Sequence, residues 1–281
     1  MIQITIRNLK LFFRDKTAVF FSLLGVIIII GLYALFLGDI VTSGMNDLPD
    51  VRFLMDSWIM SGVLAVTSIT TTMGAFGIMI EDRYNKLIKD FTSSPVSRAS
   101  LAGGYILSAY VIGVILSIIT LVLFQIYIGR FLSLAVLIKV LGLILLSVLA
   151  SSSMVFFLTC FIKSQNAFGT ASTILGTLIG FMTGIYIPIG QLPEAVQTVI
   201  RFFPVSHAAV LFRKIILEEP IYNSFKNAPV EYKNNFIDIM GINFKYGDYS
   251  FPAVGSIIVL AATAILFYTL SIWILSRKSK R

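Results

Sequence analysis

The stretch from Glu81 to Arg98, EDRYNKLIKDFTSSPVSR, interrupts an otherwise apolar part of the chain. It is flanked by the runs Trp58–Ile80 and Gly104–Ile128, and neither run contains an Asp, Glu, Lys, Arg or His residue. Each run is long enough to cross a membrane, whereas a segment with so many charges cannot stay in hydrocarbon. The pattern therefore predicts a membrane protein in which residues 81–98 form a loop in water that is long enough to fold as a short helix.

The composition also predicts a polytopic membrane protein. Apolar residues make up 57% of the chain and charged residues 13%, with a mean hydropathy of +0.90, against roughly 45–50% and 25% in soluble domains. Lipid offers no partners for backbone groups, so spanning stretches of about 20 apolar residues are expected to be helices. Six stretches qualify: Ala18–Gly38, Trp58–Ile80, Gly104–Ile128, Val140–Ile162, Ala167–Ile187 and Phe251–Leu275. We therefore expect an all-α fold of six transmembrane helices, with residues 1–281 as a single transmembrane domain.

The distribution of Lys and Arg predicts the orientation of the chain. In the short connections these residues gather in segment 1–17, in residues 81–98 and in the tail after Leu275. The first and third connections, on the other side, hold only Arg52, Arg130 and Lys139, and the six Lys and Arg residues of the long fifth connection are discounted because of its length. Because positive charge in short loops stays on the cytoplasmic side, both termini are expected in the cytoplasm of a multi-pass protein of the plasma membrane.

Residues 1–17 have the pattern of a helix that lies in the membrane interface. Ile2, Ile6, Leu9 and Phe13 fall on one helical face, and basic residues form a stripe beside that face. Such a helix places its apolar side in the lipid and its cations near anionic headgroups. The alternative is a basic flank that only fixes the topology.

The fifth apolar stretch carries small residues at a spacing that suits close helix packing. Gly176, Gly180 and Gly184 recur at every fourth position, with Thr173 and Thr177 on the same face. Small residues in this pattern let another helix approach closely, either within the chain or across a dimer interface. The alternative is that the glycines face lipid and have no such role.

The long connection 188–250 predicts helical pieces that do not span the membrane. Pro188, Pro193 and Pro204 divide its apolar first part into segments too short to cross a bilayer. Segments of this kind form interfacial or re-entrant structure, which is tolerated at membrane depth where protein or water surrounds it. The polar and aromatic residues 218–250 are expected to form either a small external cap or a loop.

Two absences from the sequence limit the function. The six stretches contain no ionisable residue, which weakens the case for an ion- or proton-coupled carrier. The chain also has no G-x-x-x-x-G-K-[ST] motif that would cradle phosphates. A single cysteine, Cys160, and a single histidine, His207, provide no metal site, and no catalytic or cofactor-binding group of residues is evident. We therefore expect a non-enzymatic chain, and its net charge of +8 is attributed to topology and not to a nucleic acid partner.

The chain resembles the membrane subunits of type-2 ABC exporters, the permeases that pair with a separate ATPase. The resemblance rests on the basic N-terminal segment, on the loop ending in DFTSSPVSR before the third span, and on a pattern after the fifth span. That last pattern comprises Gly184, Pro188, Leu192, Pro193, Pro204 and Arg213. The chain departs from the family at Lys86, where many members have glycine, and in the greater length of residues 218–250.

The resemblance implies a complex of two permease chains, identical or related, with two ATPase subunits that bind ATP and Mg. Residues 81–98 would be the coupling helix docked on the ATPase, and the chain itself would bind no cofactor. Substrate would enter between the first and fifth spans of opposite subunits, and residues 188–217 would form the external gate with Pro188, Pro193 and Pro204. Membrane lipid would be a further partner.

The spacing within residues 81–98 also favours a docking helix. Tyr84, Leu87, Ile88 and Phe91 recur at three- and four-residue intervals, which gives a helix a partly apolar face amid charge. The alternative is a charged turn in which this spacing has no role. The residues assigned to ATPase coupling are Glu81, Asp82, Tyr84, Leu87, Ile88, Phe91 and Pro95.

These observations lead to a functional hypothesis with two alternatives. The first is the transmembrane subunit of an ATP-driven exporter that moves an amphiphilic substrate, such as a drug, a lipid-like compound or a hydrophobic peptide. Spans without charged residues favour an amphiphile over a strongly ionic solute. The alternatives are an ion-coupled secondary carrier and a membrane subunit for assembly or signalling that transports nothing.

Overall fold

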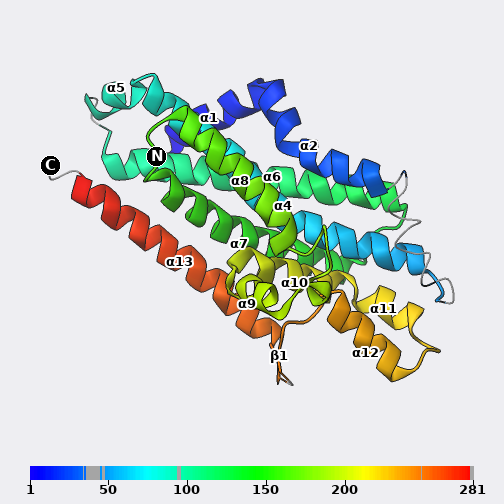
Figure 1. The fold of residues 1–281 in the computed structure, drawn as a ribbon. Coiled ribbons are helices and arrows are strands. Elements are labelled where there is room, and N and C mark those ends of the chain that lie inside the picture. Colours follow the sequence, from blue (N-terminus) through cyan, green and yellow to red (C-terminus); the bar gives the residue numbers. More distant parts are fainter. Residues whose placement is uncertain (34, 36–44, 46–47, 94–95, 248, 279–281) are drawn as a thin grey trace.

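The computed structural model describes residues 1–33, 35, 45, 48–93, 96–247 and 249–278. The long helices lie side by side in an elongated bundle (Figure 1). They are α1 Ile2–Arg14, α2 Lys16–Leu32, α4 Val51–Tyr84, α6 Arg98–Ile128, α7 Leu134–Thr159, α8 Gln165–Met182 and α13 Ala253–Lys278. One end of the bundle, here called the α5 end, holds α1, the end of α13 and the short helix α5, Leu87–Ser93.

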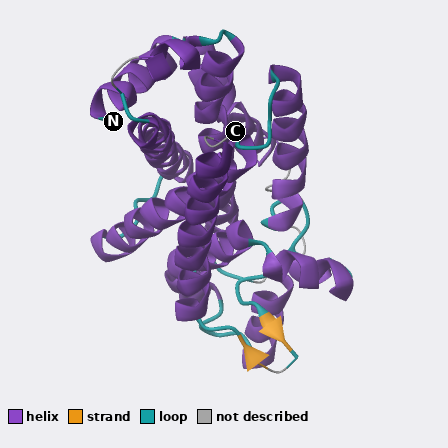
Figure 2. Cartoon of the chain, turned by 90° about the vertical axis from the view of Figure 1, so that its left-hand side faces the viewer, coloured by secondary structure: helices purple, strands orange, loops and turns teal. Residues whose placement is uncertain are grey.

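The opposite end is formed by residues 188–250, here called the cap. It contains the 3-10 turn η2 Ile189–Gln191 and the short helices α9 Glu194–Phe202, α10 Pro204–Ile216, α11 Glu218–Ser224 and α12 Val230–Ile239. A small antiparallel hairpin, β1 Lys245–Tyr246 and β2 Tyr249–Ser250, leads into α13 (Figure 2). Residues 218–250 are therefore a folded part of this cap and not a loop, which is the first of the two structures expected from the sequence.

Helix lengths confirm a multi-pass membrane protein with four to six spans. The helices α4, α6, α7 and α13 are each long and apolar enough to cross a membrane. The pairs α1–α2 and α9–α10, bent by 74° and 93°, would raise the number to six if each pair is one span. The helix α8 has 18 residues and ends at Met182, before the expected limit at Ile187, and it is not among the four. The exact six-span arrangement and the side on which each terminus lies stay predictions.

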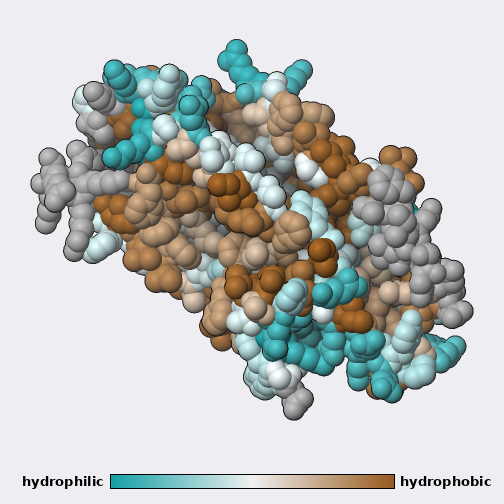
Figure 3. Space-filling view, viewed as in Figure 1, coloured by the Kyte–Doolittle hydropathy of each residue, from teal (hydrophilic) through white to brown (hydrophobic). Residues whose placement is uncertain are grey.

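Surface polarity follows the same long axis as the helices. Figure 3 shows hydrophobic residues over the middle of the bundle and hydrophilic residues gathered at its two ends. A bilayer offers hydrocarbon to the middle of such a body and water to its ends. This distribution is the one expected of a bundle whose long axis crosses the membrane.

Serine side chains begin several of the helices. Ser97, Ser133 and Ser164 each accept a hydrogen bond from the backbone N–H three residues later, at the starts of α6, α7 and α8. These bonds satisfy N–H groups that have no partner within the helix. The helix α6 ends at Gly129, whose φ of 70° suits a residue without a Cβ.

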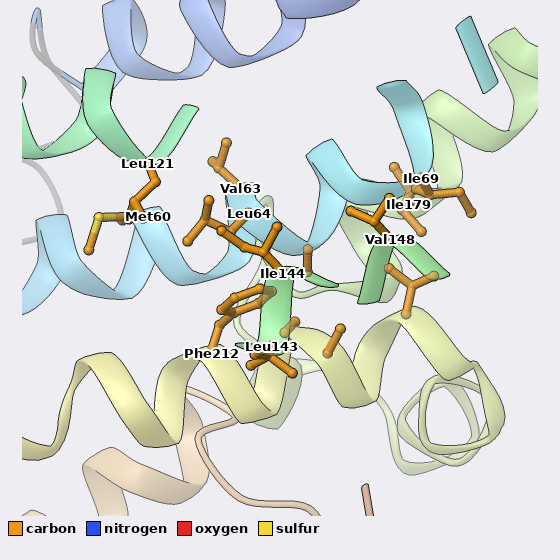
Figure 4. Packing of buried hydrophobic residues seen from close by; sticks show 14 of the residues in the cluster. Met60, Val63, Leu64, Ile69, Leu121, Leu143, Ile144, Val148, Ile179 and Phe212 are labelled. Carbon is orange, nitrogen blue, oxygen red and sulfur yellow. The ribbon is translucent and has the colours of Figure 1, made fainter. Parts of the chain in front are cut away.

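The helix α4 is the centre of the bundle. It has 34 residues, is buried over most of its length, and packs against α6, α7 and α10. Figure 4 shows Val63 and Leu64 of α4 gathered with Ile144 of α7 and Phe212 of α10. Because lipid is as apolar as these side chains, close packing and not transfer from water holds the helices together.

Hydroxyl groups on α4 form hydrogen bonds within the protein, with the exception of Ser57, whose buried Oγ has no partner among the described residues. Ser61, Thr67 and Thr71 donate to backbone carbonyls one turn earlier, at 2.6–2.8 Å. Ser68 also pairs with Ser151 of α7 at 3.1 Å, which joins the two helices within the core. Internal hydrogen bonds of this kind allow a polar helix to remain buried.

The closest approach of α6 to α4 and α7 occurs at Gly113. A Cβ placed there would lie 2.7 Å from a methyl group of Val148 and 2.8 Å from the methyl group of Thr72, so these branched side chains would have to shift. We expect Gly113→Ala to lower the free energy of unfolding by about 1–3 kcal/mol, because it overpacks this contact. The matched control is Gly142→Ala on α7, where a Cβ meets nothing within 4 Å. Thermal unfolding in detergent should show a lower midpoint for the first variant only, and equal midpoints would contradict the packing.

Candidate functional site

The segment predicted as one coupling helix, residues 81–98, contains two helices. Glu81 to Tyr84 form the last turn of α4, and α5 begins at Leu87 and has only seven residues. Between them Lys86 adopts a left-handed conformation with φ of 62°. This conformation costs an L-residue roughly 1 kcal/mol and is the natural place for glycine. The break at Lys86 corrects the expected single helix and gives a physical reason for the family's glycine at that position.

The break also divides the apolar face expected over Tyr84, Leu87, Ile88 and Phe91. Tyr84 is 65% exposed and Leu87 36% exposed, so both face outward. Ile88 and Phe91 instead pack against the core of the same chain. The outward apolar surface is therefore smaller than expected, and Pro95 lies outside the described residues.

Asp82 is buried at the α5 end and does not lie on the outer surface as a docking residue would. Its carboxylate accepts two hydrogen bonds from the guanidinium of Arg7, at 2.6 and 2.8 Å, and one from the Tyr105 hydroxyl at 2.6 Å. A bidentate guanidinium–carboxylate pair fixes both position and orientation. Asp82 therefore joins α4 to α1 and α6 from a buried position, whereas Glu81 is exposed. The assignment of both residues to ATPase coupling stays a prediction.

The same guanidinium connects α1 to the short helix. The Arg7 guanidinium carbon lies 5.2 Å from the centre of the Phe91 ring, within the range of a cation–π contact. Arg7 was expected to face lipid headgroups, and its pairing with Asp82 corrects that expectation. Neither Arg7 nor Tyr105 was assigned to the site from the sequence. The basic stripe on residues 1–17 was the only sequence feature that drew attention to Arg7.

The helix α1 lies against the bundle with both polar and apolar side chains inward, and its buried residues are Ile4, Thr5, Asn8 and Phe12. Asn8 donates to the Ser108 hydroxyl at 3.2 Å, and Thr5 donates to the carbonyl of Gly104 at 3.3 Å. On the other side Ile2 and Ile6 are exposed. An exposed apolar side and a bend of 74° before α2 suit a helix in the membrane interface, as the sequence predicts.

The end of α7 is held by the residue after Asp82. Arg83 donates to the carbonyls of Thr159 at 3.0 Å and Ile162 at 2.6 Å. A cation at a helix C-terminus satisfies carbonyls that lack partners in the helix and complements the helix dipole. Three residues therefore connect the helices at the α5 end. Asp82 and Arg7 join α1, α4, α5 and α6, and Arg83 joins α4 to the end of α7.

The glycines of the fifth stretch do not share one face. Gly184 lies beyond the end of α8, in a turn with φ of 71°, which corrects the expected helical register. The ring of Tyr186 from the same chain covers Gly180, while a Cβ at Gly176 would meet nothing within 4 Å. Thr173 and Thr177 are exposed. The described chain thus leaves the side of α8 with Gly176 and the two threonines uncovered.

The three prolines assigned to the external gate stand at the starts of cap elements. Pro188 precedes η2, Pro193 precedes α9, and Pro204 is the first residue of α10. Proline is tolerated at a helix start because its missing N–H would have no partner there. The bend of 93° between α9 and α10 falls at Pro204.

Arg213 of α10 is fully buried at the cap end. It donates to the carbonyls of Thr183 at 2.7 Å and Gly241 at 3.3 Å, and its guanidinium carbon lies 4.7 Å from the centre of the Trp58 ring. In the described part of the chain it forms no ion pair. The sequence marked Arg213 only as part of a family pattern, and its burial was not foreseen.

Two cavities lie along α2. One, of about 320 Å³, is formed by α2, α4 and α8 around Ser22, Thr70 and Ser172. The other, of about 510 Å³, lies at the cap end, between the end of α2, Trp58 of α4 and the turn that follows α8. The lining of both is mostly apolar.

Comparison with known proteins assigns the chain to a family. Residues 51–273 match the model of the ABC-2 family transporter proteins. The chain belongs to this family. It is similar to the linearmycin resistance permease protein LnrN of Bacillus subtilis, at 33% identity over 138 residues, which are 48% of this chain and 34% of the relative.

The ABC-2 chain is also similar to nodulation protein J of two Rhizobium species. The identity is 37% over 81 residues for Rhizobium leguminosarum bv. trifolii and 33% over 81 residues for Rhizobium meliloti. Each match covers 29% of this chain and 31% of the relative. The chain thus spans about a third of the length of the curated relatives it matches. Family membership supports a membrane subunit of an ABC transporter.

The ion pair of Asp82 gives a stability prediction. We expect Asp82→Asn to lower the free energy of unfolding by about 1–3 kcal/mol, because Arg7 loses its charged acceptor in a partly buried place. Arg7→Met should destabilise by a similar amount, and the double variant by less than the sum of the two. The control is Glu81→Gln, an exposed neighbour. Thermal unfolding measures all four variants, and strictly additive effects would contradict the pairing.

Proposed function

We propose that this chain is the membrane subunit of an ATP-driven exporter that moves an amphiphilic substrate outward. In this proposal the α5 end faces the cytoplasm and the ATPase docks against α5 and the end of α4. The observation that carries it is the exposed pair Tyr84 and Leu87 beside a segment that Arg7 and Asp82 fix to the bundle. A docking surface can transmit force only where it is rigidly attached to the spans.

The arrangement supports a coupling path from α5 to the core. A push on α5 reaches Phe91 and Arg7, and then Asp82 on α4. Since α4 is one continuous helix in the centre of the bundle, movement of its end moves the packed neighbours as well. Family membership and the lack of a phosphate-binding motif both support an ATPase on another chain.

A second permease chain is proposed to pack against α8 and α2. Thr173 and Thr177 of α8 are exposed, and so is Phe20 of α2, while Gly176 and Phe21 line the cavity between these helices and α4. Small residues allow a partner helix to approach closely. The partner is an identical or a related chain.

The proposed substrate class follows from the apolar cavities along α2. None of the described residues that line the cavity around Ser22, Thr70 and Ser172 is charged. Such a site accommodates apolar groups and offers hydroxyl oxygens as hydrogen-bond acceptors. One relative is named for resistance to linearmycin, which supports export of a harmful compound as the direction of transport.

Docking of the ATPase can be tested with a matched pair of tyrosines. We expect Tyr84→Asp together with Leu87→Asp to prevent co-purification of the ATPase with the permease, because both changes place charge on the exposed apolar surface. The control is Tyr222→Asp in the cap, where the tyrosine is 64% exposed against 65% for Tyr84. If the Tyr84 and Leu87 variant still co-purifies with the ATPase and still transports, the assignment of these residues to ATPase coupling is wrong.

Transport itself is measured in vesicles that contain the permease with its ATPase. The exporter predicts amphiphile movement that requires ATP and stops in the Tyr84 and Leu87 variant. An ion-coupled carrier would instead lose transport when the ion gradient collapses and keep it without the ATPase. A subunit for assembly or signalling would bind its partner but move no amphiphile.

The orientation gives a separate prediction. The native cysteine, Cys160, is buried, and Cys160→Ser provides a background for single cysteines. In intact cells a membrane-impermeant maleimide should label Tyr222→Cys and spare Tyr84→Cys, which should react only after the cells are opened. Labelling of Tyr84→Cys in intact cells would place the α5 end outside.

A further inference from the structure

The cavity at the cap end is bordered by groups that Arg213 holds. Trp58, Ile185 and Met240 all line it. Arg213 stacks on the Trp58 ring. It also donates to the carbonyls of Thr183, two residues before Ile185, and of Gly241, the residue after Met240. Trp58 in turn donates from its indole nitrogen to the Met240 carbonyl at 2.8 Å. One side chain therefore fixes α4, the turn after α8 and the end of α12 around this space.

Two glycines lie beside the guanidinium. A Cβ at Gly62 or at Gly184 would touch one of its terminal nitrogens at 3.4 Å, which is an ordinary contact, and would collide with Ile185 at 2.5 Å or with Ile189 at 2.6 Å. Gly184 also needs its positive φ to place the Thr183 carbonyl at the end of α8. Burial of an arginine without an ion pair is costly unless its donors are used. Both terminal nitrogens donate to carbonyls, while Nε is buried without a hydrogen-bond partner.

The cavity excludes charge. Its described lining is apolar or aromatic apart from the Tyr33 hydroxyl and the Gln191 amide, and Arg213 is directed at carbonyls behind the Trp58 and Ile185 wall. Uncharged hydrogen-bonding groups in an apolar space fit the apolar part of an amphiphile and not its ionic group.

The two cavities lie on the same helices. On α2 the first ends at Ser22 and the second begins at Ile29, a separation of about 10 Å at a rise of 1.5 Å per residue. Both also use α4 and residues of α8 or of the turn after it. The two cavities are thus separate spaces that both have α2 and α4 in their walls, and the second lies nearer the cap.

We propose that the cap-end cavity holds the uncharged apolar part of the exported amphiphile before release, and that Arg213 is the positioning residue that shapes it. This inference rests on the proposed function for the identity of the occupant. Binding in the cavity is nevertheless measurable without an ATPase and without transport.

Trp58 reports on the cavity directly. Trp58 and Trp273 are the only tryptophans in the sequence, so Trp273→Phe leaves Trp58 as the single tryptophan, which can be excited selectively over tyrosine. The probe is dodecyl maltoside brominated on its alkyl chain, added below its micelle concentration to the chain in lipid nanodiscs. We expect saturable quenching of Trp58, about tenfold weaker binding in Arg213→Met, and partial recovery in Arg213→Lys, which keeps a donor and the charge.

Control variants and probes separate the outcomes. Gly176→Leu, in the other cavity, should leave the quenching unchanged while slowing transport. Equal quenching in Arg213→Met and the parent chain would overturn the positioning role. Quenching by a dibrominated phospholipid in the nanodisc with none by the maltoside would assign the cavity to bilayer lipid and overturn the proposed occupant. Saturable quenching in a protein that shows no ATP-driven transport would contradict the proposed function alone.

If Arg213→Met does not fold, a comparison of probes with different charge tests the role of Arg213 in the unchanged chain. A brominated dodecanoate anion is expected to bind more weakly than the maltoside, because the guanidinium is used for carbonyls and the lining is uncharged. Tighter binding of the anion would make Arg213 a ligand for the headgroup and overturn its role as a positioning residue.

Discussion

The bundle depends on a long helix that is buried in an apolar environment and yet carries many hydroxyl groups. Each hydroxyl bond within α4, such as Thr67 to Val63 and Thr71 to Thr67, removes a polar group from the surface that the helix offers to its neighbours. Only then can α6, α7 and α10 pack directly against it. In a bilayer, where a lipid tail competes equally with a leucine, this closeness is what favours helix association over separation.

Both ends of α4 are fixed by arginines from other elements. Near one end Arg7 of α1 forms an ion pair with Asp82, and near the other Arg213 of α10 stacks on Trp58. The two positions are 24 residues apart in the numbering, about 36 Å along a helix. The two contacts differ chemically, because the first arginine has a carboxylate partner and the second donates to backbone carbonyls. An ion pair is easily re-formed after a displacement, whereas carbonyl contacts of Arg213 require the turn at Gly184 to keep its shape.

Much of the fold could be predicted from hydrophobic runs, because a membrane-length apolar stretch has few alternatives to a helix. The spans around Trp58–Ile80, Gly104–Ile128 and Phe251–Leu275 are therefore found at the expected places. Side-chain direction was harder to predict. Asp82 looks like a surface charge in the sequence, and only the arrival of Arg7 from α1 makes its burial possible.

Local backbone conformation was the other source of error. The spacing of Tyr84, Leu87, Ile88 and Phe91 fits one helix, but the left-handed Lys86 separates Tyr84 on α4 from the other three residues on α5. A spacing of four likewise placed Gly184 on a helix that ends before it. Periodicity assumes an unbroken helix, and a single residue with positive φ invalidates it for every position that follows.

The continuity of α4 has a thermodynamic consequence. If a ligand near Trp58 favours one position of this helix, the contacts around Asp82 and α5 experience the same shift in population. Linkage then requires reciprocity, because a partner bound at α5 must change the ligand's affinity near Trp58 by the same factor as the ligand changes the partner's affinity. Cargo and energy source would in this way regulate each other across the bilayer without any contact between them.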